Sequence, residues 1–158
     1  SKENILNSIE KMYEESRNIA RDDIDKIIDE DFSTRLFELL NSYSSDNQKV
    51  LLLGNNQENW ESISTRVQSE IFYIIREVMI NMKKHSQAKF ASIQIEKKLE
   101  NQLSIKYTDN GIGIENLQKN KTSGLLNMEN RIAEIGGEIN FDKNLKQGLI
   151  ISIKIPIL

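Results

Sequence analysis

The most telling stretch of the sequence is residues 76–88, REVMINMKKHSQA, which ends a long segment of helical periodicity. Apolar residues recur on one stripe of this segment, and they are Val67, Ile71, Ile74, Ile75, Val78 and Met82. That spacing predicts an amphipathic helix from about Ser64 to His85.

Four polar residues lie together on this predicted helix. Glu77 and Asn81 are four residues apart, and Lys84 and His85 follow one turn later. A regular helix therefore places all four on one side, beside the apolar stripe. A carboxylate and a carboxamide at the border of a core are costly unless they are hydrogen-bonded or bind a ligand. The residues alone leave both a buried hydrogen-bond network and a ligand site open.

A second segment with chemical potential is residues 109–113, DNGIG, directly after a predicted strand. The two glycines allow a backbone to approach a flat ligand closely. The carboxylate of Asp109 can accept a hydrogen bond from an exocyclic amine. The alternative is an ordinary turn, for which Asp-Asn-Gly is a common sequence.

A third segment, residues 122–127, TSGLLN, leads into another predicted helix. Free backbone N–H groups at a helix start attract phosphate. The alternative is a plain helix cap formed by Thr122 or Ser123.

The rest of the chain predicts an α+β protein: a two-layer sandwich in which helices cover one face of a mixed, mostly antiparallel sheet. Helices are expected over residues 4–30, 32–43 and 124–135, the last ending at Gly136-Gly137. Strands are expected over residues 49–54, 90–97, 102–108, 138–141 and 149–155. The second and third of these form a hairpin, and the apolar run at residues 49–54 predicts a buried strand.

Composition excludes several classes of function. A net charge of −3 over 158 residues gives no electrostatic support for nucleic-acid binding. The sequence has no cysteine and one histidine, so it cannot form a thiolate or His-rich metal site. Any metal is expected to be a hard ion with oxygen ligands, such as magnesium. No apolar run approaches the roughly 20 residues of a membrane helix, so we expect no membrane contact by this chain.

Taken together, the three segments resemble the nucleotide-binding boxes of the histidine kinase catalytic domain, in the superfamily that includes gyrase, Hsp90 and MutL. Residues 76–88 resemble the N box, and residues 109–113 complete the Asp-x-Gly-x-Gly pattern. Residues 123–131 are similar to the short ATP lid of kinases that signal to NarL/LuxR-type response regulators. The resemblance covers residues 50–156 or so and implies the ATP-binding fold of that superfamily.

The resemblance implies a role for each matching residue. Asn81 would ligate magnesium, Glu77 would act as base or polariser toward the incoming histidine, and Lys84 and His85 would neutralise phosphate charge. Asp109 would accept from the adenine amino group.

The glycines and the lid complete the implied site. Gly111 and Gly113 would give the adenine ring room, and the backbone of Gly124, Leu125 and Leu126 would close over the phosphates. One departure concerns Leu149. A Gly-Thr pair often supports the adenine pocket in such domains, whereas this chain has Gly148-Leu149 and lacks that hydroxyl.

The second departure concerns the phosphoacceptor histidine of the family. No residue of this chain matches it. Residues 1–30 are interpreted as the second helix of a truncated dimerisation hairpin, and residues 31–158 as the ATP-binding domain. An unrelated N-terminal extension is the alternative.

The resemblance implies an ATP- and Mg2+-dependent protein-histidine kinase domain that phosphorylates a histidine outside these residues. Its expected partners are the histidine-bearing dimerisation helix of a homodimeric parent kinase and a NarL/LuxR-type response regulator. The expected location is the cytoplasm, with a parent protein that can be membrane-anchored. Two alternatives stay open: an ATPase or anti-sigma-like serine kinase with the same pocket, and a nucleotide-binding module without catalysis.

Overall fold

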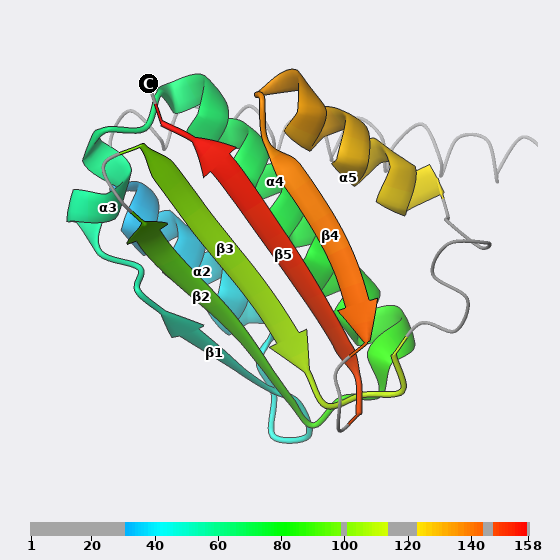
Figure 1. The fold of residues 1–158 in the computed structure, drawn as a ribbon. Coiled ribbons are helices and arrows are strands. Elements are labelled where there is room, and N and C mark those ends of the chain that lie inside the picture. Colours follow the sequence, from blue (N-terminus) through cyan, green and yellow to red (C-terminus); the bar gives the residue numbers. More distant parts are fainter. Residues whose placement is uncertain (1–30, 99–100, 114–122, 144–146, 158) are drawn as a thin grey trace, which may run out of the picture.

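A five-stranded mixed sheet organises the molecule, with the strand order β1-β2-β3-β5-β4 (Figure 1). The computed structural model describes residues 31–98, 101–113, 123–143 and 147–157. The strands are β1 (Lys49–Leu53), β2 (Phe90–Lys98), β3 (Gln102–Asp109), β4 (Glu138–Lys143) and β5 (Leu149–Pro156). β1 pairs with β2 in parallel, and the other neighbours are antiparallel. The predicted hairpin is confirmed as β2–β3.

Helices cover one face of this sheet and leave the other open (Figure 1). They are α2 (Phe32–Tyr43), α3 (Gln57–Glu61), α4 (Thr65–Asn81), the π-helical turn η1 (Met82–Ser86) and α5 (Ser123–Glu134). Burial alternates along β3, where Leu103, Ile105 and Tyr107 point to the helices and are at most 3% exposed. This period of two is typical of a sheet with one solvated face. The predicted two-layer α+β sandwich is confirmed.

The centre of the core is the apolar stripe of α4. Five of its residues are buried, and they are Ile71, Ile74, Ile75, Val78 and Met79. Ser64 caps the helix by accepting a hydrogen bond from the Val67 N–H at 3.3 Å, as the predicted start requires. α4 is therefore buried in the core from Ile71 to Met79.

The predicted end of α4 is only partly right. Regular α-helix stops at Asn81, and the chain continues through the π turn to Ser86 before Gln87 adopts a φ of 53°. The placement of Glu77, Asn81, Lys84 and His85 on one side assumes a regular α-helix. That assumption does not hold beyond Asn81. Periodicity cannot foresee this turn, because the apolar stripe ends at Met82, where the turn begins.

Residues 55–61 are mostly polar, yet the structure attaches them to the core. They contain α3, whose Trp60 is fully buried and donates from Nε1 to Asn55 Oδ1 at 2.8 Å. Trp60 also packs edge-on against Phe32, with ring centroids 4.6 Å apart. One aromatic side chain thus ties this polar segment into the core.

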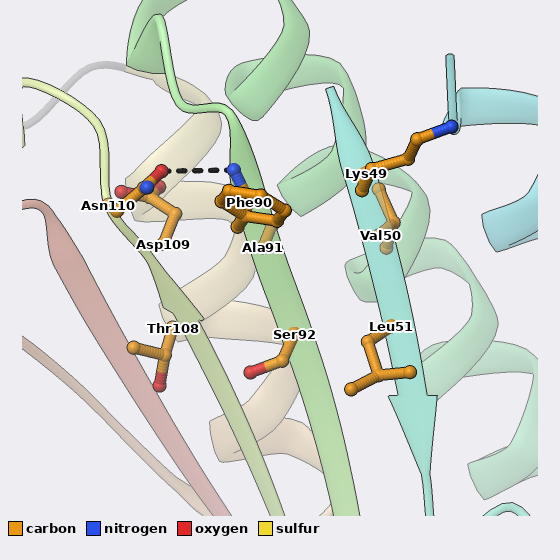
Figure 2. Close-up of a pocket in the computed structure, with 9 residues that line it drawn as sticks. All are labelled: Lys49, Val50, Leu51, Phe90, Ala91, Ser92, Thr108, Asp109 and Asn110. Atoms are coloured by element: carbon orange, nitrogen blue, oxygen red, sulfur yellow. Dashed lines mark hydrogen bonds between the residues drawn. The ribbon is translucent and has the colours of Figure 1, made fainter. Parts of the chain in front are cut away.

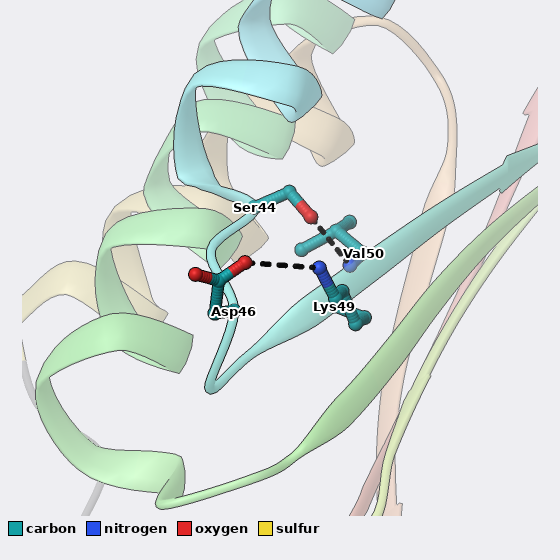
Figure 3. Close-up of polar contacts among 4 residues, drawn as sticks. All are labelled: Ser44, Asp46, Lys49 and Val50. Carbon is teal, nitrogen blue, oxygen red and sulfur yellow. Dashed lines mark hydrogen bonds and ion pairs between the residues drawn. The ribbon is translucent and has the colours of Figure 1, made fainter.

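The strand predicted at residues 49–54 is present as β1, but the prediction that it is buried is wrong. β1 lies at the edge of the sheet, where Leu51 is 57% exposed and Leu53 is 44% exposed. Figure 3 shows how the strand begins: Ser44 Oγ accepts from the Val50 N–H at 3.3 Å, and the Lys49 ammonium lies 3.7 Å from Asp46. An apolar run alone does not distinguish an edge strand from a central one.

Two further sequence expectations can be placed. α5 ends before Gly136, whose φ of 77° confirms the predicted glycine stop. The helix expected over residues 4–30 lies outside the described residues. Within the part of the chain that the structure describes, no helix is long and apolar enough to cross a membrane.

Candidate functional site

The most completely hydrogen-bonded candidate is Asp109, the last residue of β3, which is only 3% exposed. Its Oδ1 accepts from the Gly111 N–H at 2.9 Å and from the Leu149 N–H at 3.2 Å. Its Oδ2 accepts from the Tyr107 hydroxyl at 2.5 Å. These donors compensate for burying a charge and hold the carboxylate in one orientation.

The Tyr107 hydroxyl stays protonated in this setting. Burial raises the pKa of Tyr107 far above its ordinary value of 10.0, and the hydrogen bond to Asp109 and its negative charge raise it further. The hydroxyl is therefore a permanent donor to the carboxylate at neutral pH.

The loop after Asp109 packs directly on the end of the long helix. The Ile112 N–H donates to the Ser86 carbonyl at 2.7 Å. A Cβ on Gly111 would lie 2.0 Å from that same carbonyl oxygen, so no residue with a side chain fits there. The structure thus places the Asp109–Gly113 segment in contact with the end of the N-box segment. A single site formed by both segments requires such a contact.

A second glycine closes this site from β5. Gly148 has a φ of 105°, and a Cβ there would lie 2.1 Å from the backbone oxygen of Asp109. The following Leu149 places its N–H on the carboxylate while its side chain is buried. Gly148 therefore lets β5 approach Asp109 closely enough to make this hydrogen bond.

Glu77 and Asn81 lie on the last turns of α4, one helical turn apart and half-buried. Among the described residues, no hydrogen bond or ion pair to the side chain of either is found. The alternative of a buried hydrogen-bond network is therefore not what this part of the chain forms. Two half-buried oxygen-bearing groups without protein partners are suited to a ligand.

Lys84 and His85 lie in the π turn and are exposed, as is Lys83. Their side chains therefore lie at the surface rather than in the interior of the protein. π-helical turns often occur at functional sites. Here the turn leads directly to Ser86, whose Oγ donates to the Met82 carbonyl at 2.8 Å and holds the turn in shape.

The lid segment is described only from Ser123, since residues 114–122 lie outside the described residues. Leu125 is buried at 4% exposure, Gly124 is half-buried and Leu126 is 45% exposed. Farther along α5, Arg131 bonds to Glu70 of α4 at 3.0 Å and stacks 3.7 Å above the Tyr73 ring. These contacts fix α5 against α4.

Magnesium coordination needs few side chains, because Mg2+ is usually bound by one or two of them plus substrate phosphates and water. The Asn81 and Glu77 oxygens fit that requirement. In the described ranges, no group of three or more His, Cys, Asp or Glu residues is placed to hold a metal ion. The residues present therefore suit a metal shared with phosphates rather than a protein-only cage.

A separate depression of about 460 Å3 lies across β1, β2 and the end of β3 (Figure 2). Leu51, Ser92 and Thr108 face it from three neighbouring strands and are partners in register. Asn110 borders it, and its Oδ1 accepts from the Phe90 N–H at 3.0 Å. This depression is on the open face of the sheet, opposite the helices, so it is distinct from the space beside α4.

Comparison with known proteins identifies the family. Residues 66–158 match the model of the histidine kinase-, DNA gyrase B- and HSP90-like ATPases, which is more than half of the chain. The chain belongs to this ATPase family. Residues 66–158 include both the N-box segment and the Asp109 loop.

Among curated relatives, the ATPase domain is similar to two sensor histidine kinases of Bacillus subtilis. It is 32% identical to YdfH over 99 residues, which is 60% of this chain and 24% of YdfH. It is 34% identical to LiaS over 97 residues, which is 61% of this chain and 27% of LiaS. The match thus spans about a quarter of the length of these relatives.

Solved structures confirm the fold of the ATPase domain. The histidine kinase domain of the blue-light activated kinase EL346 from Erythrobacter litoralis aligns with a TM-score of 0.62 at 17% identity, over 80% of this chain and 61% of that one. The ATP binding domain of PrrB from Mycobacterium tuberculosis aligns with a TM-score of 0.56 at 14% identity, over 77% of this chain and 93% of that one.

Sequence reasoning did not foresee the contacts that three residues make around Asp109 and its loop. Tyr107 reads as an ordinary alternating strand residue, although its spacing of two from Asp109 places both side chains on one face. Ser86 and Gly148 act through contacts with residues distant in sequence, which no local pattern shows. Gly111 was predicted to leave room for a ligand. The structure adds a second reason for a glycine there, because a Cβ would collide with the Ser86 carbonyl oxygen.

Proposed function

We propose that this ATPase domain is the catalytic domain of a sensor histidine kinase, which binds Mg-ATP and passes the γ-phosphoryl group to a histidine on another helix. The carrying observation is the buried, hydrogen-bonded Asp109 carboxylate, whose following loop bonds through the Ile112 N–H to Ser86, at the end of the helical segment that bears Glu77 and Asn81. The names of YdfH and LiaS as sensor histidine kinases support the same assignment.

In this proposal the adenine ring binds at Asp109. Its carboxylate accepts from the 6-amino group, and the backbone of Gly111 and Gly113 forms the adjoining wall. The two backbone donors on Oδ1 support the role, because they orient the acceptor before the nucleotide arrives.

The triphosphate lies along the end of α4. Asn81 supplies a carboxamide oxygen to Mg2+, and Lys84 and His85 neutralise phosphate charge from the rim. The backbone N–H groups of Gly124, Leu125 and Leu126 close over the phosphates, as expected of a helix start. Bound magnesium would supply charge neutralisation of the phosphate oxygens.

Glu77 is assigned to the incoming histidine. As the imidazole nitrogen bonds to the γ-phosphorus, the bond to the ADP oxygen breaks and ADP leaves. The Glu77 carboxylate orients the imidazole and accepts its N–H proton. Phosphoryl transfer depends mainly on positioning and charge, so a half-buried carboxylate with no side-chain partner among the described residues suits this role.

The proposal extends to partners. The phosphoacceptor helix belongs to the dimerisation hairpin of a homodimeric parent kinase, with residues 1–30 as part of it. The final acceptor is a response regulator of NarL/LuxR type, which the short lid favours. ATP as phosphodonor assigns the reaction to the cytoplasm.

The test is transfer in trans. The purified chain is incubated with Mg-ATP labelled at the γ-phosphate and a separate dimerisation hairpin carrying a phosphoacceptor histidine. We expect acid-labile label on the hairpin and none when its histidine is replaced by glutamine. Label on serine would instead support the serine kinase alternative, and ATP binding without any transfer would support the non-catalytic module.

A further inference from the structure

Tyr107 and Asp109 are two residues apart on β3, so both side chains point to the helix-covered face of the sheet. Each is 3% exposed, and Tyr107 lies between Ile93 of β2 and Ile151 of β5 in the register. In these apolar surroundings the hydroxyl donates to Asp109 Oδ2 at 2.5 Å. A buried tyrosine hydroxyl usually has a hydrogen-bond partner. This hydrogen bond also acts on its acceptor, the Asp109 carboxylate.

The effect is orientation of the carboxylate. Both backbone donors, from Gly111 and Leu149, bond to the same oxygen, Oδ1. The terminal torsion of an aspartate is broad, so a donor on the second oxygen further restricts rotation of the carboxylate plane. The Tyr107 hydroxyl is such a donor, because it bonds to Oδ2.

Leu149 contributes a backbone donor to this carboxylate and no side-chain donor. Its N–H bonds to Asp109 Oδ1, and its buried side chain has no hydroxyl. Tyr107 of β3 supplies a side-chain hydroxyl, which bonds to Oδ2.

We propose that Tyr107 is a positioning residue that orients the Asp109 carboxylate toward the 6-amino group of adenine. This inference rests on the proposed function, because it assumes that adenine binds at Asp109. Since the hydroxyl keeps its proton at neutral pH, the carboxylate stays the acceptor for the amino group.

The experiment compares two nucleotides on the purified chain by calorimetry in Mg2+. One is ATP, and the other is purine riboside triphosphate, which has hydrogen in place of the 6-amino group. Tyr107→Phe removes the hydroxyl and keeps the ring. We expect ATP affinity to fall about tenfold, as for the loss of a hydrogen bond to a charged group, while affinity for the analogue is unchanged.

The matched control is Ile105→Val, a conservative change on the same face of β3 that does not contact Asp109 by hydrogen bonding. We expect it to keep the parental preference for ATP. Because the preference is a ratio within one variant, partial unfolding lowers both affinities alike and cancels.

Three results would overturn the inference: an unchanged preference in Tyr107→Phe, an equal loss for both nucleotides, or the same selective loss in Ile105→Val. Failure of the proposed function has a different signature. If the unsubstituted chain binds neither nucleotide, the function and the inference fall together, whereas binding with an unaltered preference in Tyr107→Phe removes the inference alone.

Discussion

At the residue scale, Asp109 carries the recognition of adenine. Asp109→Asn replaces an oxygen acceptor by an amide that donates, next to the Gly111 and Leu149 N–H groups or the Tyr107 hydroxyl. We expect ATP affinity to fall roughly 10- to 100-fold, from about 1.5–3 kcal/mol per hydrogen bond to a charged group. Calorimetry measures the loss, with the exposed Asp142→Asn as control. Unchanged affinity would refute the adenine assignment.

Glu77 is predicted to act on the transfer step and not on binding. Glu77→Gln keeps the size of the side chain but removes its basicity, and general base catalysis contributes about 10²- to 10⁴-fold. We expect ATP affinity to stay and the rate of transfer to a histidine hairpin to fall within that range. Glu134→Gln, an exposed change on α5, is the control. Transfer at the parental rate would end the catalytic role.

The raised pKa of Tyr107 predicts a dependence of stability on alkaline pH. Because the folded pKa lies above the unfolded value of 10.0, the stabilisation is fully present below pH 10.0 and is lost as pH rises above it. Urea unfolding between pH 8 and 11, roughly the span around that value, should show a steeper decline for the parent than for Tyr107→Phe. Parallel declines would contradict the assigned burial.

At the scale of elements, α5 is held to α4 by Arg131. The guanidinium pairs with Glu70 and covers the Tyr73 ring, but it is 39% exposed, so solvent screens part of the ion pair. Arg131→Met is expected to lower the free energy of unfolding by about 1 kcal/mol. Urea unfolding measures this, with the exposed Arg66→Met as control. Equal free energies of unfolding for Arg131→Met and Arg66→Met would show that the contacts of Arg131 with Glu70 and Tyr73 do not stabilise the fold.

The elements also show what sequence patterns can predict. Alternation along residues 90–108 predicts the β2–β3 hairpin. Successive side chains of a strand point to opposite faces, so the pattern shows on which face each residue lies. The same reasoning fails for β1, because Leu51 and Leu53 are as apolar as core residues although they lie on the open face. The π turn is equally hidden, since it changes the direction of Lys84 and His85 without changing the apolar stripe.

At the scale of the whole molecule, the candidate site joins residues that the chain keeps far apart. The Asp109 loop could be predicted from its glycines and its place after a strand. Its contacts with Ser86 and Leu149 could not, because they depend on β3 lying between β2 and β5 and on where α4 ends. The structure describes residues 31–98, 101–113, 123–143 and 147–157. Of the proposed cleft, these residues include the adenine end most fully.

The most direct measurement is magnesium-dependent nucleotide binding by the whole chain and by Asn81→Ala. Calorimetric titration with ATP should show tight binding in Mg2+ and weaker binding after chelation. Asn81→Ala should bind equally weakly in both conditions, because the carboxamide ligand is gone. Equal ATP affinity of the parent with and without Mg2+, or an Asn81→Ala variant that titrates like the parent, would contradict a cleft formed by the end of α4 and the Asp109 loop around a metal-bound triphosphate.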